Sequence, residues 1–468
     1  MANSPSRLQI ELVSVSFLIT AVFFGWIAFF GYFFSDDFTW LWHGKKLLEN
    51  PGAIFSAHMS SFYSPVVNAY FTFLLPLFGP WAPGYYLVNL AVHILASALV
   101  GVFAWQLTRS RILALAACIL ATLAGSAYEP IVWIASNLHS IATLFILSAC
   151  CSYLAYRKTG KIFFAGISSF SVALAFLTKE VAIVTPVLLV LSGVVHGRVA
   201  YRVASKRSHA IFATCIAAIT LLYGYQEYLW QKEGFSVASG IWSPHLSALL
   251  RYPFALVQMI VPVERFVSAS SAAWIGSAGS ALWITTLIAG RKRPLILFGL
   301  SWIVVSLLPV IFFADSESPY LIASRYTYLA RIGLILAFLG FIAPLLRGPI
   351  KNPKFVFSLV LVSALSASHL VFVYNRLTTE YAYVYQTGRT LVSALEEMKN
   401  YPDHILYVSR ERPFDKNDAA IVGAASVVAD ISESRIVFLK KDEKKIPGKN
   451  ETLLTWDYQK KLFTLGPK

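Results

Sequence analysis

Residues 13–40 read VSVSFLITAVFFGWIAFFGYFFSDDFTW, a long apolar run that ends in two adjacent acids, Asp36 and Asp37. The run Val13–Phe34 is long enough to cross the ~30 Å hydrocarbon core of a bilayer as a helix. It is too long for the core of a signal peptide and lacks a small-residue cleavage site, so it predicts a retained membrane span. The acids follow this span directly. Two interpretations are open: they cap a following helix, or they take part in chemistry.

The rest of the chain repeats this apolar pattern. Of 468 residues, 57% are hydrophobic and only 13% are charged, a composition that excludes a soluble protein of this size. We therefore expect an α-helical polytopic membrane protein with a bundle of about eleven transmembrane helices. The predicted spans are 12–34, 84–107, 111–127, 139–156, 162–178, 181–195, 209–229, 272–290, 294–313, 326–346 and 355–374.

The charges predict the orientation. Placing the N-terminus in the cytoplasm puts five short basic loops without Asp or Glu on the inner side, as the positive-inside rule requires. The long loops 35–83, 230–271 and 314–325 then lie outside, together with the C-terminal residues. The net charge of +15 is thus explained by topology and does not indicate nucleic-acid binding. All four cysteines fall in predicted spans, which argues against a disulfide framework or a metal-binding quartet.

After residue 374 the sequence changes from mainly apolar to polar and mixed. The segments HILYVSR and SRIVFLK alternate like short strands, and TLVSALEEMKN has the pattern of a helix. We therefore divide the chain into a membrane module, 1–374, and a small extracytoplasmic α/β region, 375–468. Residues 38–52, FTWLWHGKKLLENPG, predict an amphipathic helix lying at the membrane interface just after the acid pair.

Four local patterns resemble the polyprenol-phosphate-sugar-dependent glycosyltransferases of the GT-C fold, and look closest to bacterial relatives of protein O-mannosyltransferases and related membrane mannosyltransferases. The first follows the acid pair, at residues 62–99, where Ser64 stands in place of the family's arginine. The others lie in YEPIVWIASNLHSIATLF (128–145), LAFLTKEVAIVTPVLLVL (174–191) and SRYTYLARIGL (324–334). The matching residues are Tyr63, Pro65, Leu77–Gly79, Pro83–Tyr85, Asn89, Leu90, His93, Glu129, Trp133, Lys179, Glu180, Pro186, Arg325, Tyr326 and Tyr328.

This resemblance implies an inverting transfer of a sugar from a polyprenyl-phosphate-linked donor to an acceptor hydroxyl on a glycan, lipid or protein. Asp36 would be the general base, and Asp37 would orient it or hold the acceptor. Arg325 and Lys179 would bind the donor phosphate. The expected substrate-binding residues are Glu129, Tyr326, Tyr328, Trp133, His139 and Tyr63.

The resemblance and the predicted topology together also lead to expectations about the cofactor, the cellular location and His93. No metal site is readable in the sequence and no cofactor is expected, although one branch of the family uses a divalent ion, which Asp36 and Glu129 would share. The expected location is the plasma membrane of a bacterium, with the active site outside the cytoplasm, where a sugar donor must be lipid-linked. His93, near the middle of a predicted span, is expected to be a packed, hydrogen-bonded histidine.

Other function classes stay open. A lipid-linked saccharide flippase or transporter would carry charged residues along a path through several spans, whereas the charges here lie mostly at span ends. A non-catalytic membrane partner with a GT-C fold stays open because of the departures at Ser64, Asn137, His139 and Ser324. A ligase or polymerase using pyrophosphate-linked donors would typically carry more arginines in the 230–271 loop.

Overall fold

The computed structural model describes most of the chain. The described residues are 5–57, 63–123, 125, 127–196, 206–232, 246–261, 269–312, 322–345, 353–401, 403–409, 418–439, 445–457 and 459–466. Residues 233–245 and 262–268 of the predicted outer loop 230–271, and residues 314–321 of the predicted loop 314–325, lie outside them.

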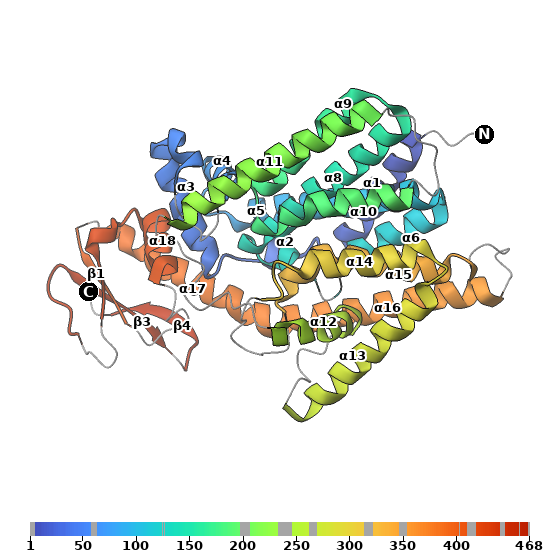
Figure 1. The fold of residues 1–468 in the computed structure, drawn as a ribbon. Helices are drawn as coiled ribbons and strands as arrows, with labels where there is room; N and C mark the ends of the chain where they lie inside the picture. Colours follow the sequence, from blue (N-terminus) through green and yellow to red (C-terminus); the bar gives the residue numbers. More distant parts are fainter. Residues whose placement is uncertain are drawn as a thin grey trace.

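Apolar helices form the main body, and each predicted span overlaps at least one of them (Figure 1). They are α1 (Pro5–Phe23), α2 (Ile27–Phe30), α5 (Ala82–Thr108), α6 (Arg111–Thr122), α8 (Leu138–Thr159), α9 (Ile162–Phe176), α10 (Thr185–His196), α11 (Lys206–Lys232), α13 (Ala269–Gly290), α14 (Pro294–Leu307), α15 (Thr327–Ile342) and α16 (Pro353–Arg376). Among the described helices, five are long and apolar enough to cross a membrane. The total of about eleven spans therefore stays a prediction.

The first predicted span, 12–34, is not one continuous helix. Helix α1 ends at Phe23, the short α2 follows, and residues 31–34 are extended. Gly31 follows α2, and a side chain is excluded there because a Cβ would lie closer than 3.0 Å to the ring of Tyr86. The chain thus leaves the apolar bundle as an extended segment packed tightly against α5, directly before the acid pair.

Short elements gather at the end of the bundle where this segment emerges. Helix α3 (Asp36–Glu49) confirms that the predicted segment is helical and carries both acids in its first turn, whereas its place at the membrane interface stays a prediction. The other elements of this end are η1 (Pro51–Phe55), α4 (Pro65–Phe78), α7 (Glu129–Val132), η2 (Ala135–Asn137), η3 (Glu180–Val184), η4 (Leu246–Leu250), α12 (Arg251–Ile260) and η5 (Ser324–Tyr326).

The C-terminal residues form the predicted small α/β region. A π-helical turn, η7 (Leu377–Tyr381), leads from α16 into α17 (Ala382–Glu397) and η8 (Met398–Asn400). The four-stranded sheet has the order β2-β1-β3-β4, with β1 parallel to β2 and β3, and with β3 and β4 antiparallel. Its elements are β1 (Ile405–Val408), α18 (Asp418–Ala429), η9 (Glu433–Arg435), β2 (Ile436–Phe438), β3 (Glu451–Asp457) and β4 (Leu462–Leu465).

This C-terminal domain, Ala382–Leu465, lies at one end of the helical bundle, beside α3 (Figure 1). Its hydrophobic residues share one core with the segment around the acid pair. That core contains Phe33, Phe34, Phe38, Leu41, Tyr85, Tyr86, Tyr385, Leu391, Leu395, Leu406, Val408, Ile421, Ala424, Ala425, Leu454 and Trp456. The strands of the sheet and the first outer segment are therefore parts of one packed unit.

Candidate active site

A cavity of about 360 Å³ opens at the end of the bundle that carries the short elements. Five segments that are far apart in the sequence contribute its walls: the start of α3, Ser64, the segment 133–139, Lys179 and η5. The lining residues are Asp36, Thr39, Trp40, Ser64, Trp133, Ala135, Ser136, Leu138, His139, Lys179, Arg325 and Tyr326. Most of the residues predicted from the sequence thus meet around one space.

The two adjacent acids have different surroundings. Asp36 is exposed and lines the cavity, whereas the side chain of Asp37 is fully buried. Successive residues of an α-helix point about 100° apart, so only one member of an adjacent pair faces a given cavity. The predicted site residue that reaches the cavity from this pair is therefore Asp36.

Asp37 ties two backbone segments together. Its Oδ2 accepts a hydrogen bond from the backbone N–H of Phe34 at 3.0 Å, and its Oδ1 accepts one from Ala135 at 2.7 Å. Burial raises the pKa of this carboxyl, while the two N–H donors favour its charged form and oppose the shift. Both donors lie outside α3, so Asp37 connects the helix start to the far wall of the cavity rather than capping its own helix.

The residue before the acids has an unusual backbone conformation. Ser35 has φ +45° and ψ −121°, in a region that residues with a Cβ rarely adopt. Such conformations cost on the order of 1–3 kcal/mol and persist only where the surrounding structure enforces them. This conformation lies directly before the helix start from which Asp36 lines the cavity and Asp37 is buried.

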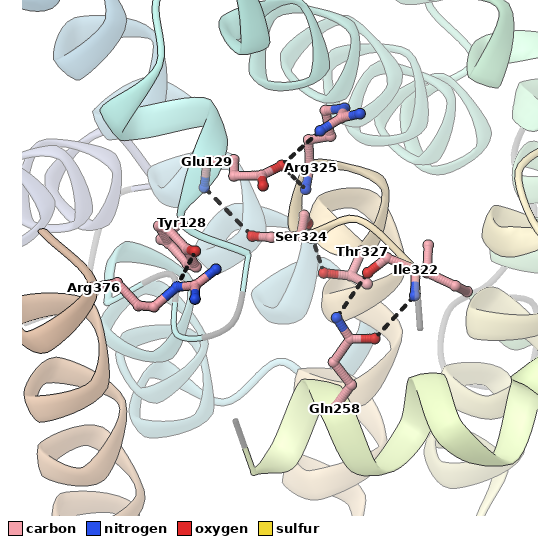
Figure 2. Close-up of polar contacts among 8 residues, drawn as sticks. All are labelled: Tyr128, Glu129, Gln258, Ile322, Ser324, Arg325, Thr327 and Arg376. Atoms are coloured by element: carbon pink, nitrogen blue, oxygen red, sulfur yellow. Dashed lines mark hydrogen bonds and ion pairs between the residues drawn. The ribbon is translucent and has the colours of Figure 1, made fainter. Parts of the chain in front are cut away.

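Arg325 is held by Glu129 at the cavity wall, as Figure 2 shows. The Glu129 Oε2 accepts hydrogen bonds from the Arg325 backbone N–H at 3.0 Å and from its Nη1 at 3.2 Å. The backbone N–H of Glu129 in turn donates to the Ser324 Oγ at 3.4 Å. The Arg325 guanidinium also lies over the rings of Tyr326 and Trp133, 4.9 and 5.4 Å from their centroids. These contacts fix the cation in a partly buried position.

The segment that leads to Arg325 is anchored from a second side (Figure 2). Gln258 of α12 donates through Nε2 to the Ile322 carbonyl at 2.7 Å, and its Oε1 accepts from the Ile322 N–H at 3.3 Å. The Thr327 hydroxyl donates to the Ser324 carbonyl at 2.8 Å. The neutral side chain of Gln258 thus bonds both backbone groups of Ile322 and holds the residues that precede η5 in place.

Lys179 supplies a second cation. Its Nζ lies 3.0 Å from the Glu180 Oε2, and both side chains are largely buried, 16% and 11% exposed. The predicted Lys179–Glu180 segment therefore forms a local ion pair and also lines the cavity. Among the described residues, the lining therefore holds the Asp36 carboxylate and two cations, each of which pairs with an acid outside the lining.

Three predicted aromatic or imidazole residues line the cavity together. The rings of His139 and Tyr326 meet edge to face with centroids 5.2 Å apart. Trp133 stacks on Phe34 at 5.3 Å. These rings provide flat apolar surfaces next to the charged groups.

Three other predicted site residues do not line the cavity. Glu129 acts on it through Arg325. Tyr328 is buried, and its hydroxyl lies 2.7 Å from Nδ1 of His93. Tyr63 packs edge to face on Trp230, with ring centroids 5.0 Å apart, although its neighbour Ser64 does line the cavity.

His93 confirms the expectation of a packed histidine. Its Nδ1 meets the Tyr328 hydroxyl at 2.7 Å and its Nε2 meets the Thr122 carbonyl at 2.8 Å. Both ring nitrogens are satisfied, and the side chain has no exposed surface.

Sequence reasoning missed some of the lining residues. Ser136 is the most informative, because its buried hydroxyl has no hydrogen-bond partner among the residues that the structure describes. A buried polar group of this kind at a cavity wall is available to a bound molecule. Its position between Trp133 and His139 is the signal that could have found it.

Arg331 is a charged residue inside the bundle, away from the cavity. Arg331 of α15 is 5% exposed and donates to the Leu120 carbonyl at 3.1 Å, with Nδ1 of His369 3.4 Å from the same nitrogen. The expectation that the charges lie mostly at span ends therefore has an exception at Arg331.

The divalent ion that the resemblance raises would be shared by Asp36 and Glu129. No group of three or more His, Cys, Asp or Glu side chains comes together within the described ranges. One of the two Glu129 oxygens, Oε2, accepts the two hydrogen bonds from Arg325.

Comparison with known proteins identifies the fold. No family model matches the sequence, and no curated protein matches it either. The archaeal oligosaccharyltransferase AglB from Archaeoglobus fulgidus, in complex with an inhibitory peptide and a dolichol-phosphate, is similar with a TM-score of 0.52 at 11% identity. That match covers 91% of this chain and 64% of AglB, so this chain spans less than two thirds of AglB's length.

A second solved structure, apo ArnT from Cupriavidus metallidurans, is similar with a TM-score of 0.50 at 13% identity, over 93% of this chain and 86% of ArnT. Both proteins have the GT-C fold. The structural likeness therefore confirms the GT-C fold that the sequence patterns predicted.

Proposed function

We propose that this GT-C chain is an integral membrane glycosyltransferase that moves a sugar from a polyprenyl-phosphate-linked donor to an acceptor hydroxyl outside the cytoplasm. The observation that carries the proposal is the cavity itself, in which Asp36 shares one space with Lys179 and Arg325. A base for the acceptor and cations for a phosphate leaving group are the two requirements of such a transfer. The cavity volume of about 360 Å³ also suits a small polar group such as a sugar, since ligand pockets run from roughly 300 to 1,000 Å³.

In this mechanism Asp36 is the catalytic base. Its carboxylate takes the proton from the acceptor hydroxyl while that oxygen attacks the anomeric carbon of the donor sugar. The bond between the anomeric carbon and the phosphate oxygen breaks on the opposite side, so the configuration inverts. Asp37 acts indirectly. Its hydrogen bonds with the backbone of Phe34 and Ala135 hold the start of α3 in place, and this fixes the position of Asp36.

The departing polyprenyl phosphate gains negative charge as this bond breaks. Arg325 and Lys179 stabilise that charge, because fixed cations lower the barrier most where charge develops. Arg325 is the stronger candidate, since a guanidinium can grip two phosphate oxygens at once. Glu129 keeps the guanidinium in place between turnovers by accepting its hydrogen bond.

The remaining lining residues recognise the substrates. Trp133 and Tyr326 offer ring faces to the sugar or to the first units of the prenyl chain. His139 and the unpartnered hydroxyl of Ser136 offer hydrogen bonds to sugar or acceptor hydroxyls. Tyr63 does not line the cavity, and it supports the cavity wall by packing on Trp230 next to Ser64.

A lipid-linked donor agrees with the location that we propose for the site. The basic loops favour a cytoplasmic N-terminus in a bacterial plasma membrane, which puts the cavity and the C-terminal domain outside the cytoplasm. Nucleotide sugars are absent there, so the donor has to arrive within the bilayer. AglB, which shares the fold, was solved with a dolichol-phosphate and a peptide, and this supports a lipid phosphate as carrier and a protein as one candidate acceptor.

The experiment that tests the proposal gives the purified protein, in lipid nanodiscs, a panel of synthetic polyprenyl-phosphate sugars with peptide, glycan and lipid acceptors. We expect transfer of the sugar to one acceptor class, with inversion at the anomeric carbon. A parallel vesicle assay measures movement of the same lipids across the bilayer. Movement without transfer would replace the proposal by a flippase, and neither activity would favour a non-catalytic partner.

A further inference from the structure

The C-terminal domain packs directly on the backbone that carries Asp36. Helix α17 lies against the extended segment before the acid, and α18 lies against α3 after it. The ring centroid of Phe34 lies 5.9 Å from that of Tyr381 and 6.0 Å from that of Tyr385. Phe38 shares one hydrophobic core with Ile421. The domain therefore contacts the chain on both sides of the proposed base.

Two glycines make these contacts possible. A Cβ at Gly388 of α17 would lie closer than 3.0 Å to the carbonyl oxygen of Phe33, and a Cβ at Gly423 of α18 would lie closer than 3.0 Å to that of Phe38. In both places the obstacle is backbone, which cannot rotate away as a side chain can. The helices of the C-terminal domain thus touch the main chain three residues before and two residues after Asp36.

Polar contacts join the same surfaces. The Lys45 Nζ donates to the Ser426 carbonyl at 2.7 Å and lies 2.5 Å from the Asp430 carboxylate. The Arg389 Nη2 donates to the Phe30 carbonyl at 2.7 Å. The Tyr385 hydroxyl donates to the Val132 carbonyl at 2.5 Å, next to the Trp133 wall of the cavity.

The segment held in this way includes the strained residue Ser35. Its positive φ needs support from surrounding structure, and Asp37 on one side and the two glycine contacts on the other provide that support. A base must be held within about 0.5 Å of its productive position, and a misplacement of 1 Å can cost about 100-fold in rate.

We propose that the C-terminal domain is a positioning element for Asp36, with Gly388 and Gly423 as the positioning residues. A methyl group at either glycine pushes the helix off the backbone of residues 33–38 and displaces the carboxylate. The kinetic part of this inference rests on the proposed transfer reaction, whereas the structural part does not.

The test compares Gly388→Ala and Gly423→Ala with Gly448→Ala. The control glycine lies in the same domain, but a Cβ there would meet only the flexible carboxylate of Glu451, at 3.3 Å. Lys45→Met is a milder variant that removes the polar link and leaves both glycines. Hydrogen–deuterium exchange of intact, folded protein is read at the amides of residues 33–38 and, separately, at those of β1 and β3.

We expect Gly388→Ala and Gly423→Ala to speed exchange at residues 33–38 by about tenfold or more, while the strand amides keep wild-type protection. Lys45→Met should give a smaller increase, and Gly448→Ala none. Unchanged exchange at residues 33–38 in folded glycine variants would overturn the inference. If the glycine variants do not fold, unchanged exchange in Lys45→Met would overturn it.

Kinetics provide the second measurement. With turnover corrected for the folded fraction, kcat should fall about tenfold or more in the two variants while KM for the donor stays within about twofold. A change in KM with kcat preserved would contradict a positioning role. Absence of transfer by the wild-type protein would defeat the proposed function alone, because the exchange experiment still decides whether the domain orders residues 33–38.

Discussion

The sharpest prediction concerns Asp37→Asn, which changes one carboxylate oxygen into an amide nitrogen. Asp37 is fully buried, and each of its two oxygens accepts a backbone N–H, from Phe34 at 3.0 Å and from Ala135 at 2.7 Å. Asparagine has only one acceptor oxygen, so one of these N–H groups would face the NH₂ of the new side chain. A buried donor then loses its partner while the other bond loses its charge.

The magnitude follows from these two losses. A buried unsatisfied donor costs about 1–3 kcal/mol, and a hydrogen bond to a charged group contributes about 1.5–3 kcal/mol. Removing the buried charge offsets part of this, because burial already disfavours the carboxylate, as its raised pKa indicates. We expect a net loss of about 2–3 kcal/mol in the free energy of unfolding, and a fall in Tm of about 2–3 °C.

The assay is thermal unfolding in detergent, followed by a dye that reacts with thiols as they become accessible. Cys118, Cys150 and Cys151 are free and buried, and Cys215 is exposed and gives the starting signal. The matched control is Asp36→Asn, the same substitution at the neighbouring, exposed residue, which should shift Tm by less than about 1 °C. Equal Tm values for wild type and Asp37→Asn, or equal losses in both variants, would refute the different roles assigned to the two acids.

Three further predictions address the cavity and its surroundings. Arg325→Lys should lower kcat/KM for the donor by about 10–100-fold, because lysine cannot bind a phosphate through two parallel hydrogen bonds. A loss below twofold in initial-rate assays would exclude Arg325 from phosphate binding. Ser136→Ala should leave Tm unchanged and raise one substrate KM by about 3–10-fold, since its hydroxyl has no described protein partner; unchanged KM values for donor and acceptor would contradict this. Burial lowers the pKa of His43 to about 4, so the unfolded chain takes up a proton at this residue below about pH 6.5 while the folded protein does not. Stability should therefore fall as the pH drops from about 6.5 towards 4, and the fall should be smaller in His43→Leu; the same loss of Tm in both proteins would exclude this histidine as a cause.

The sequence predicted the parts of the fold that depend on local hydrophobic pattern. The apolar stretches coincide with helices, and the amphipathic helix after the acids runs from Asp36 to Glu49. The strands around Ile405 and Ile436 also follow their alternation. These features are readable because residues close in sequence decide them.

The missed features depend on long-range contacts. A side chain at Gly31 would clash with Tyr86, which lies in another helix, and one at Gly423 would clash with Phe38, which lies far away in the sequence. Helix α18 and the hairpin of β3 and β4 were not anticipated. The docking of the C-terminal domain on α3 could not be inferred from either segment alone, because neither contains a signal for its partner.

The candidate site was predictable in composition but not in geometry. The resemblance named Asp36, Lys179 and Arg325 as members of one site, but it could not show that Asp37 is buried and bonded to the backbone of Ala135. Tyr326 and Tyr328 show the same limit: one lines the cavity, and the other is bonded to His93 inside the bundle. Residues one or two apart on a helix point in different directions, so a motif that names both overstates the site.

The central claim is that Asp36 is the general base of a sugar transfer from a polyprenyl phosphate. The most direct measurement is the rate of that transfer by purified wild-type protein, by Asp36→Asn and by Asp403→Asn, an exposed acid of the C-terminal domain that serves as control. The account predicts turnover by the wild type and the control, and a loss of about 10²–10⁴-fold in Asp36→Asn without a change in Tm. A wild-type rate in Asp36→Asn would contradict it.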